Sequence, residues 1–170
     1  MVIDELSFDE LYLAARDRLI AQIYVFTSDE TESRDLVQQA FERAWMHWRR
    51  VSKLADPEAW IRLVAFNLAK NHRRWRRHVS VQPVVPEQQS DPIADEQALI
   101  EFGQALAQIA PDQRRALILY HLVGLSVAEI ASEMSAPSGT VMSWLYRGRA
   151  QLATELERLE ATDPEDASEA

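Results

Sequence analysis

The sequence contains no cysteine, which excludes disulfide bonds and thiolate metal sites. Its four glycines form no phosphate-binding loop, and its four histidines lack the spacing of metal ligands. No nucleophile elbow is present. No apolar run approaches the roughly 20 residues that span a bilayer, and the acidic N-terminus does not resemble a signal peptide. These absences predict a cytoplasmic protein that is not an enzyme and uses no cofactor or metal.

Basic residues are scarce over most of the chain, whose formal net charge is −9. Residues 79–113 contain six acids and no base, while residues 1–40 and 151–170 each carry a net charge of −6. Residues 41–78, in contrast, contain ten bases and three acids, and their densest part is "NHRRWRRHVS" at 71–80. Because charge is segregated in this way, the overall isoelectric point is a poor guide to partners.

Helical periodicity covers nearly the whole chain, and no strand signal is persuasive. Apolar residues recur at steps of three and four over residues 6–26, and a second helix is expected to reach about Arg50. A capping box of Thr27 with Glu30 is predicted to open that second helix. A third helix is predicted to begin after Asp56, whose carboxylate can cap free amides, with a proline in its first turn.

A proline-containing stretch without basic residues, 79–96, separates two helical halves and is predicted to be a linker. The expected fold is therefore all-α, with two small helical domains at 1–78 and 97–160 and an acidic tail at 161–170. In the second half, Leu122 is expected to point inward from a helix that ends at a glycine C-cap.

The most specific local pattern is "GLSVAEIASEMSAPSGTVMSWLYRGRAQL" at 124–152. Ser126 and Glu129 predict a capping box that opens a short helix. Pro137 prevents one continuous helix, and Ser138 is expected to cap the next one. A short helix, a brief turn and a second capped helix are typical of a helix-turn-helix motif.

The basic stretch is predicted to bind nucleic acid. Two asparagines and several cations share or border one helical face: Asn67, Lys70, Asn71, Arg73, Arg74, Arg76 and Arg77. Lysine and arginine displace counterions from phosphates, and asparagine amides pair with base edges. The alternative is a solvated helix end whose arginines complement the helix dipole. Because the run is dense and free of acids, nucleic acid is the favoured interpretation.

The tryptophans divide into two groups. Trp45, Trp48 and Trp60 fall on apolar helical stripes, where core packing is the default expectation. Trp75 lies among arginines and is the better candidate for exposure. Trp60 and Trp75 also offer flat surface on which an unstacked base could rest.

Three motifs in series resemble the bacterial sigma-70 family. They are "SRDLVQQAFERAW" at 33–45, "DPEAWIRLVAFNLAKNHRR" at 56–74 and "LSVAEIASEMSAPSGTVMSWLYRGRAQL" at 125–152. The resemblance is strongest to the small extracytoplasmic-function branch, which keeps only the region 2 and region 4 domains. It implies a transcription initiation factor that joins core RNA polymerase and directs it to promoters.

For region 2, the resemblance implies that the second helix docks on the clamp helices of the polymerase β′ subunit. The matching polar surface comprises Asp35, Gln38, Gln39 and Glu42. The third helix would recognise and open the −10 element, and Asn67 matches the position that holds a flipped base. The implied −10 binding and melting residues are Trp60, Asn67, Lys70, Asn71, Arg73, Arg74, Trp75 and Arg77.

For region 4, the resemblance places the second helix of the helix-turn-helix in the major groove at the −35 element. The candidate DNA-facing residues are Ser138, Thr140, Ser143, Tyr146, Arg147 and Arg149. Relatives often have lysine or arginine where this chain has Met142 and Trp144, so its recognition helix is poor in positive charge. Met142 and Tyr146 are candidates for contact with thymine methyl groups instead.

The implied partners are core RNA polymerase, through the β′ clamp helices and the β flap, promoter DNA and an anti-sigma factor. The free chain is expected to be monomeric and not inserted in a membrane. One alternative is a sigma-factor mimic that sequesters an anti-sigma factor. Another is a stand-alone helix-turn-helix repressor, although no dimerisation heptad is visible and the motifs of the first half would then have no role.

Overall fold

The computed structural model describes residues 7–78 and 96–161, and it describes side chains for 7–73, 102–159 and 161. The expected linker, apart from its last residue, and most of the acidic tail lie outside the described residues. All regular elements within them are helical: α1 (Phe8–Thr27), α2 (Glu30–Met46), α3 (Trp48–Val51), α4 (Pro57–His78), α5 (Glu96–Gln108), α6 (Pro111–Ile118), the π-helix η1 (Leu119–Val123), α7 (Val127–Glu133) and α8 (Ser138–Glu160). This agrees with the predicted all-α fold.

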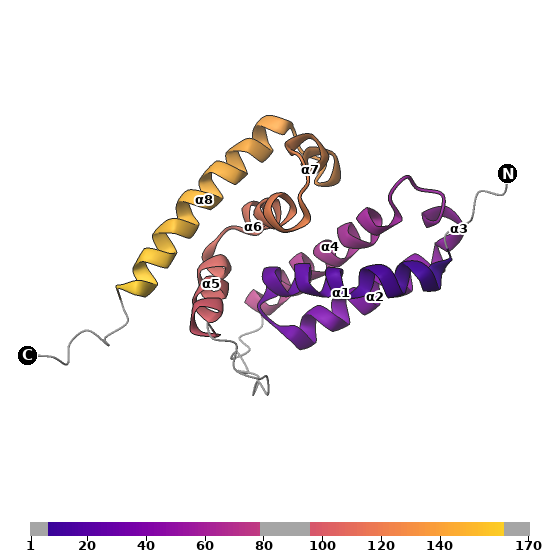
Figure 1. Ribbon diagram of the computed structural model, residues 1–170, viewed down its shortest axis with the longest axis horizontal. Coiled ribbons are helices and arrows are strands. Elements are labelled where there is room, and N and C mark those ends of the chain that lie inside the picture. Colours follow the sequence, from indigo (N-terminus) through magenta and orange to yellow (C-terminus); the bar gives the residue numbers. More distant parts are fainter. Residues whose placement is uncertain (1–6, 79–95, 162–170) are drawn as a thin grey trace, which may run out of the picture.

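The first four helices form one bundle, in which α1 packs on α2 and α4 (Figure 1). Its core is built from apolar residues that recur along each helix: Leu19, Ile23, Phe26, Phe41, Ile61 and Phe66. Phe26 and Phe66 meet edge to face, with ring centroids 5.3 Å apart. The bundle therefore holds α4 by its apolar face and leaves the polar face of that helix pointing outward.

The second half packs α5, α6 and α7 against the long helix α8 (Figure 1). The buried contacts come from Ile109, Leu119, Ile130, Val141 and Leu145. The turn that follows η1 depends on Gly124, whose φ of 82° lies in the left-handed region that favours glycine. That turn sets the direction in which α7 starts.

The helix-turn-helix prediction is confirmed at its first cap. The Ser126 amide donates to Glu129 Oε2 at 2.7 Å, and the Glu129 amide donates to Ser126 Oγ at 3.3 Å. The backbone hydrogen bond from Ser126 also lowers the pKa of the Glu129 carboxyl. The second predicted cap is wrong, because Ser138 is the first helical residue and Pro137, the residue before it, makes no side-chain hydrogen bond.

The capping box predicted at Thr27 with Glu30 is also wrong. Helix α1 continues through Thr27 and ends at Ser28, which adopts a left-handed φ of 60°. Asp29 is the N-cap of α2, and its carboxylate accepts from the Glu32 amide at 2.8 Å. The left-handed residue moves the start of α2 two residues beyond the expected cap.

Two apolar residues that were expected inside lie outside. The side chain of Trp45 is 62% exposed, because it lies at the end of α2 beyond the bundle core. Leu122 is 52% exposed. The π-helix advances by more residues per turn than an α-helix, so Leu122 is rotated off the inward face that an α-helical period predicts.

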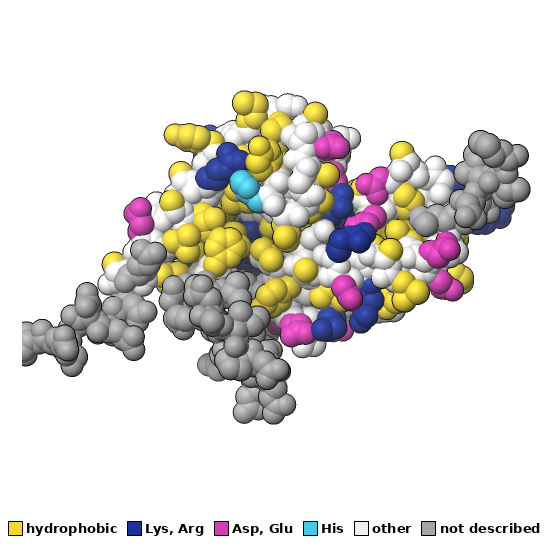
Figure 2. All heavy atoms as spheres, in the orientation of Figure 1, with side chains coloured by type: hydrophobic (Ala, Val, Ile, Leu, Met, Phe, Trp, Pro, Cys, Tyr) yellow, Lys and Arg dark blue, Asp and Glu magenta, His cyan; other side chains and the backbone are white. Residues whose placement is uncertain are grey.

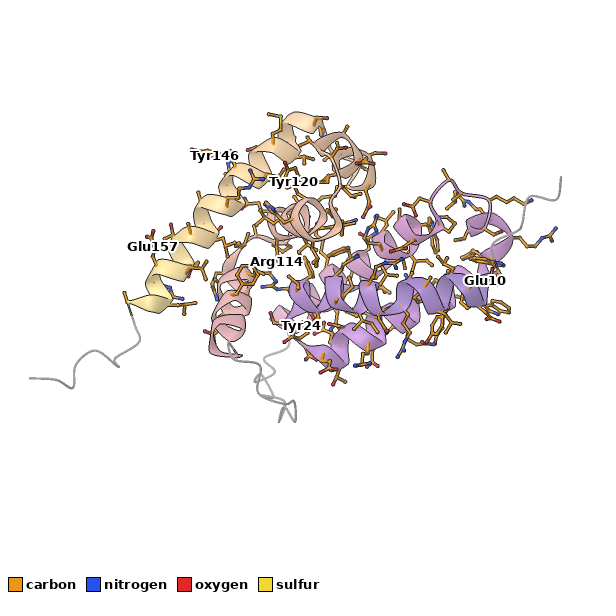
Figure 3. All side chains as sticks on the ribbon, viewed as in Figure 1. Glu10, Tyr24, Arg114, Tyr120, Tyr146 and Glu157 are labelled. Carbon is orange, nitrogen blue, oxygen red and sulfur yellow. The ribbon has the colours of Figure 1, made fainter. Side chains whose placement is uncertain are left out.

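The two halves pack against each other, although the sequence predicted modules separated by a flexible linker. Helices α5 and α6 lie against the end of α1 (Figure 1). Arg114 of α6 is only 1% exposed and donates to the carbonyl oxygens of Phe26 at 2.7 Å, Ala107 at 2.6 Å and Ile109 at 2.9 Å. Figure 3 shows Arg114 between the two halves.

We predict that Ser126→Ala lowers the free energy of unfolding by about 1 kcal/mol, because it removes a side-chain acceptor at a helix N-terminus. Ser138→Ala is the matched control, since Ser138 makes no capping bond, and it should cost clearly less. Urea denaturation followed by circular dichroism measures both. Equal losses for the two variants would contradict the assignment of the cap.

Candidate nucleic-acid and polymerase interfaces

Helix α4 presents the predicted strand-binding residues. It starts as the sequence predicts, with the Ala59 amide donating to Asp56 Oδ1 at 2.9 Å. Its apolar face is buried, and Asn67, Lys70 and Asn71 are exposed on the other side. The backbone of α4 continues to His78. The predicted contributions of Arg74, Trp75, Arg76 and Arg77 concern side chains outside the described residues.

The polar face of α4 is already engaged by the second half of the chain. Lys70 Nζ lies 2.8 Å from Asp112 Oδ1. Arg73 Nη2 donates to the Ala107 carbonyl at 2.8 Å. Asn67 Oδ1 accepts from Arg115 Nη1 at 3.4 Å, a long contact. The structure therefore brings these three predicted residues together and places acceptors or donors from α5 and α6 over them.

Sequence reasoning missed Arg62, which is only 4% exposed. Its guanidinium forms a bidentate pair with Glu133 of α7, with hydrogen bonds of 3.1 Å to Oε1 and 2.8 Å to Oε2. The only feature of the sequence that could have indicated its burial is its position between the apolar residues Ile61 and Leu63. Trp60, which was expected to pack and also to offer a stacking surface, is partly buried against the core.

Helix α2 carries the predicted polymerase-binding surface. Asp35, Gln38, Gln39 and Glu42 are all exposed. Leu36 and Phe41, which the same helix turns inward, are buried. A hollow of about 180 Å³ runs between α1 and α2 along this face. It is lined by Tyr12, Arg16, Ile20, Arg34, Asp35, Val37, Gln38 and Phe41.

The exposed Trp45 extends this surface, and sequence reasoning assigned it to the core. Its ring meets Phe8 edge to face, with centroids 5.0 Å apart. Phe8 also meets Trp48 edge to face, with ring centroids 5.3 Å apart. An aromatic cluster therefore closes the end of the bundle and holds Trp45 in place at the surface.

Helix α8 presents part of the predicted −35 surface. Ser138, Tyr146 and Arg147 are exposed, while Thr140 and Ser143 are half-buried. Tyr146 is 77% exposed and points away from the rest of the molecule (Figure 3). Met142, one turn before it, is 60% exposed. Trp144 packs against the core, so its place in the helix is structural.

Arg149 lies apart from this set. Its Nε donates to His121 Nε2 at 3.3 Å, and its guanidinium lies 5.1 Å from the centroid of the Tyr120 ring. It borders an apolar groove of about 420 Å³. The other lining residues are Val25, Phe102, Leu106, Leu117, Ile118, His121, Leu122 and Leu152. Figure 2 shows hydrophobic side chains gathering over this part of the second half.

Among the residues that the structure describes, no group of three or more His, Cys, Asp or Glu side chains is arranged to hold a metal ion. Within 7–78 and 96–161, no helix combines the length and the apolar character needed to cross a membrane.

Comparison with known proteins accounts for both halves. Residues 11–79 match the family model described as sigma-70 region 2, and residues 99–152 match the one described as sigma-70 region 4. The extracytoplasmic-function sigma factor SigL of Mycobacterium tuberculosis is 33% identical over 144 residues, which cover 80% of this chain and 81% of SigL. The chain belongs to the sigma-70 family.

Other relatives agree with this membership. The RNA polymerase sigma-E factor of Streptomyces avermitilis is 29% identical over 157 residues, or 89% of this chain and 86% of that protein. The structure of the sigma factor RpoE from Bartonella quintana, in complex with the anti-sigma factor NepR, superposes with a TM-score of 0.71 and 25% identity. It covers 88% of this chain and 96% of that one.

The chain is thus a sigma factor of the extracytoplasmic-function type, which directs RNA polymerase to promoters and binds core polymerase and promoter DNA. Sigma factors are DNA-binding regulatory subunits. A stand-alone repressor leaves the region 2 match of residues 11–79 unexplained, so that alternative is set aside.

The different placement of two arginines on α8 gives a prediction for region 4. Arg147→Ala should weaken binding to −35 duplex DNA. It should also reduce the slope of log affinity against log salt concentration by about one, because an exposed arginine can neutralise one phosphate. Arg149→Ala is the matched control and should change the salt slope less, because Arg149 lies against Tyr120 and His121. Fluorescence anisotropy at several salt concentrations measures both. A larger change of the salt slope in Arg149→Ala than in Arg147→Ala would contradict the assignment of the phosphate contact to Arg147.

Proposed function

We propose that this sigma factor opens promoters with the polar face of α4, reads the −35 element with the first turns of α8 and docks on the β′ clamp helices with α2. The observation that supports the first part is the set of exposed polar side chains at Asn67 and, one helical turn later, at Lys70 and Asn71. In this proposal the working units are residues 1–78 and 97–160, with 79–96 as their linker.

Strand separation needs no catalytic residue in this mechanism. Extruding a base costs a few kcal/mol of unstacking, and capture of the extruded base offsets that cost. An asparagine amide can donate to and accept from a base edge, which suits Asn67 to the captured base of the non-template strand. Lys70 and Arg73 then neutralise neighbouring phosphates. The chain acts with polymerase in the cytoplasm, as a regulatory subunit without enzymatic activity of its own.

At the −35 element, the exposed face of α8 combines apolar and polar groups. Met142 and Tyr146 are one turn apart, and both are largely exposed. The C5-methyl group of thymine is the apolar feature of the major groove, so this pair suits thymine positions. Arg147 and Ser138, exposed beside them, suit phosphate contacts. This arrangement compensates for the low positive charge of the helix.

We predict that Asn67→Ala reduces the rate of promoter opening by roughly tenfold, because one base-specific contact contributes about 1–3 kcal/mol. The variant should keep its fold, since the Asn67 side chain is exposed. Permanganate reactivity of the −10 region in reconstituted holoenzyme measures the opening. Gln104→Ala, at an exposed site on α5, is the matched control and should behave as wild type. Normal opening by Asn67→Ala would refute the role of this residue.

We predict that Asp35→Arg weakens core polymerase binding by roughly tenfold or more, because charge reversal places like charge against the partner surface. Asp35 is exposed and lines the hollow between α1 and α2. Asp17→Arg makes the same charge change at a side chain that is 90% exposed on α1 and outside that hollow, so it should retain affinity. Competition with wild type for core polymerase measures the affinity of both variants. Equal affinities would contradict the assignment of the docking surface to α2.

A sigma-factor mimic, which would sequester an anti-sigma factor without initiating transcription, is the remaining alternative. A mimic has no use for the polar face of α4, and this is the observation that favours the initiating factor. Core polymerase reconstituted with this chain and given a random promoter library separates the two. The initiating factor yields promoter-dependent transcripts, and the mimic yields none.

A further inference from the structure

The apolar groove of region 4 takes no part in the proposed function. Helices α5, α6, η1 and α8 line it, together with the end of α1. Seven of its nine lining side chains are apolar. Its volume of about 420 Å³ lies within the range of small-molecule sites in proteins, roughly 300–1,000 Å³. A hollow of this size and composition suits a ligand that is mostly hydrocarbon.

The groove leaves apolar surface in contact with water. Leu106, Leu117 and Ile118 line it from α5 and α6 and are nearly buried. Phe102 and Leu122, in contrast, are 41% and 52% exposed. Leu122 lies in the π-helix η1, which turns it away from the core. A hydrocarbon that covers these side chains releases the water around them, and that release is favourable.

One border of the groove carries positive charge. Arg149 and His121 are its two polar lining residues, and the bond from Arg149 Nε to His121 Nε2 joins them. The Tyr120 ring holds the same guanidinium from another side. None of the carboxylates that the structure describes forms a salt bridge with Arg149. A fixed guanidinium without an acidic partner is thus available to an anion at the edge of the apolar surface.

We propose that this groove binds an amphiphilic carboxylic acid with an unbranched hydrocarbon chain, such as a medium-chain fatty acid. The hydrocarbon covers the apolar side chains, and the carboxylate accepts hydrogen bonds from Arg149. The bond to His121 uses Nε of Arg149 and leaves its two Nη groups to meet two carboxylate oxygens. The lining includes none of the residues that the proposed function places against polymerase or DNA, so the site does not rest on that proposal.

The composition of the groove favours this ligand over a protein partner. A protein normally surrounds an apolar centre with a polar rim that needs hydrogen bonds across the interface. The lining of the groove offers only His121 and Arg149 for such contacts. A hydrocarbon chain has no polar group to satisfy, and its single carboxylate needs one cation. The groove supplies both in the proportion that a fatty acid requires.

Calorimetric titration of the free chain tests the site with hexanoate, octanoate and decanoate, each below its micelle concentration. We expect one molecule to bind per chain, with an affinity that rises about fourfold for each CH₂ group that the groove buries. Decyltrimethylammonium, a cation with a similar hydrocarbon chain, should bind at least about tenfold more weakly than decanoate. Because the net charge of the chain is −9, net charge alone would favour the cation. Absence of saturable decanoate binding, or a preference for the cation, would overturn the proposal.

Two leucine variants locate the bound hydrocarbon. Leu122→Asp places a carboxylate in the groove and should lower the affinity for decanoate at least about tenfold. Leu13→Asp is the matched control, since Leu13 lies on α1, is 80% exposed and does not line the groove. Both leucines are largely exposed, so both variants should keep the fold, which circular dichroism checks. Equal affinities would place the ligand elsewhere and overturn the proposal. So would a dimer of the wild-type chain that Leu122→Asp dissociates, because the groove would then be an interface between two copies.

A third variant tests the recognition of the carboxylate. Arg149→Gln should lower the affinity for decanoate about fivefold, the contribution expected of an ion pair that water partly screens, and should leave the affinity for decyltrimethylammonium no lower. Arg49→Gln, at an exposed arginine of α3 outside the groove, is the control and should bind decanoate as wild type does. An unchanged preference of Arg149→Gln for decanoate over the cation would overturn the role of this guanidinium. These titrations need neither polymerase nor DNA, so their outcome is independent of the proposed function.

Discussion

The arrangement of the two regions depends on one buried guanidinium. A buried arginine is costly unless its N–H groups find acceptors, and Arg114 finds three carbonyl oxygens, on Phe26, Ala107 and Ile109. One belongs to region 2 and two to region 4. Moving the regions apart would leave this side chain without the Phe26 acceptor, so a single residue ties the position of α6 to the end of α1. The approach of α6 to α4 follows from that tie.

Helix C-termini supply the acceptors. The last four carbonyls of an α-helix have no partner within the helix, and a cation at that end also complements the helix dipole. Phe26 lies in the last turn of α1, which Ser28 ends by taking a left-handed φ. Ala107 lies in the last turn of α5 and accepts from both Arg73 and Arg114. The free carbonyls at the ends of α1 and α5 thus accept hydrogen bonds from Arg114 and Arg73.

Local chemistry was predictable from the sequence, and long-range pairing was not. The caps at Asp56 and Ser126 and the all-α architecture follow from spacing within a few residues. Glu133 is 71 positions from Arg62, and no periodicity links two such residues. Each one looks like an ordinary helical charge. Trp45 was misassigned because a helical stripe continues past the point where the bundle stops covering it. The polar face of α4 was predictable, but the groups of the second half that contact it were not.

The charge pattern of the chain has a structural use. Segments of opposite sign alternate along the sequence, and folding brings two acids of the second half, Asp112 and Glu133, against the basic helix of the first. Asp112 and Glu133 are among only a few acids in a helix-turn-helix domain that must itself approach DNA. Their position against α4 keeps them away from the exposed face of α8. Asp112 therefore pairs with Lys70 on the polar face of α4, and Glu133 pairs with Arg62, which is buried.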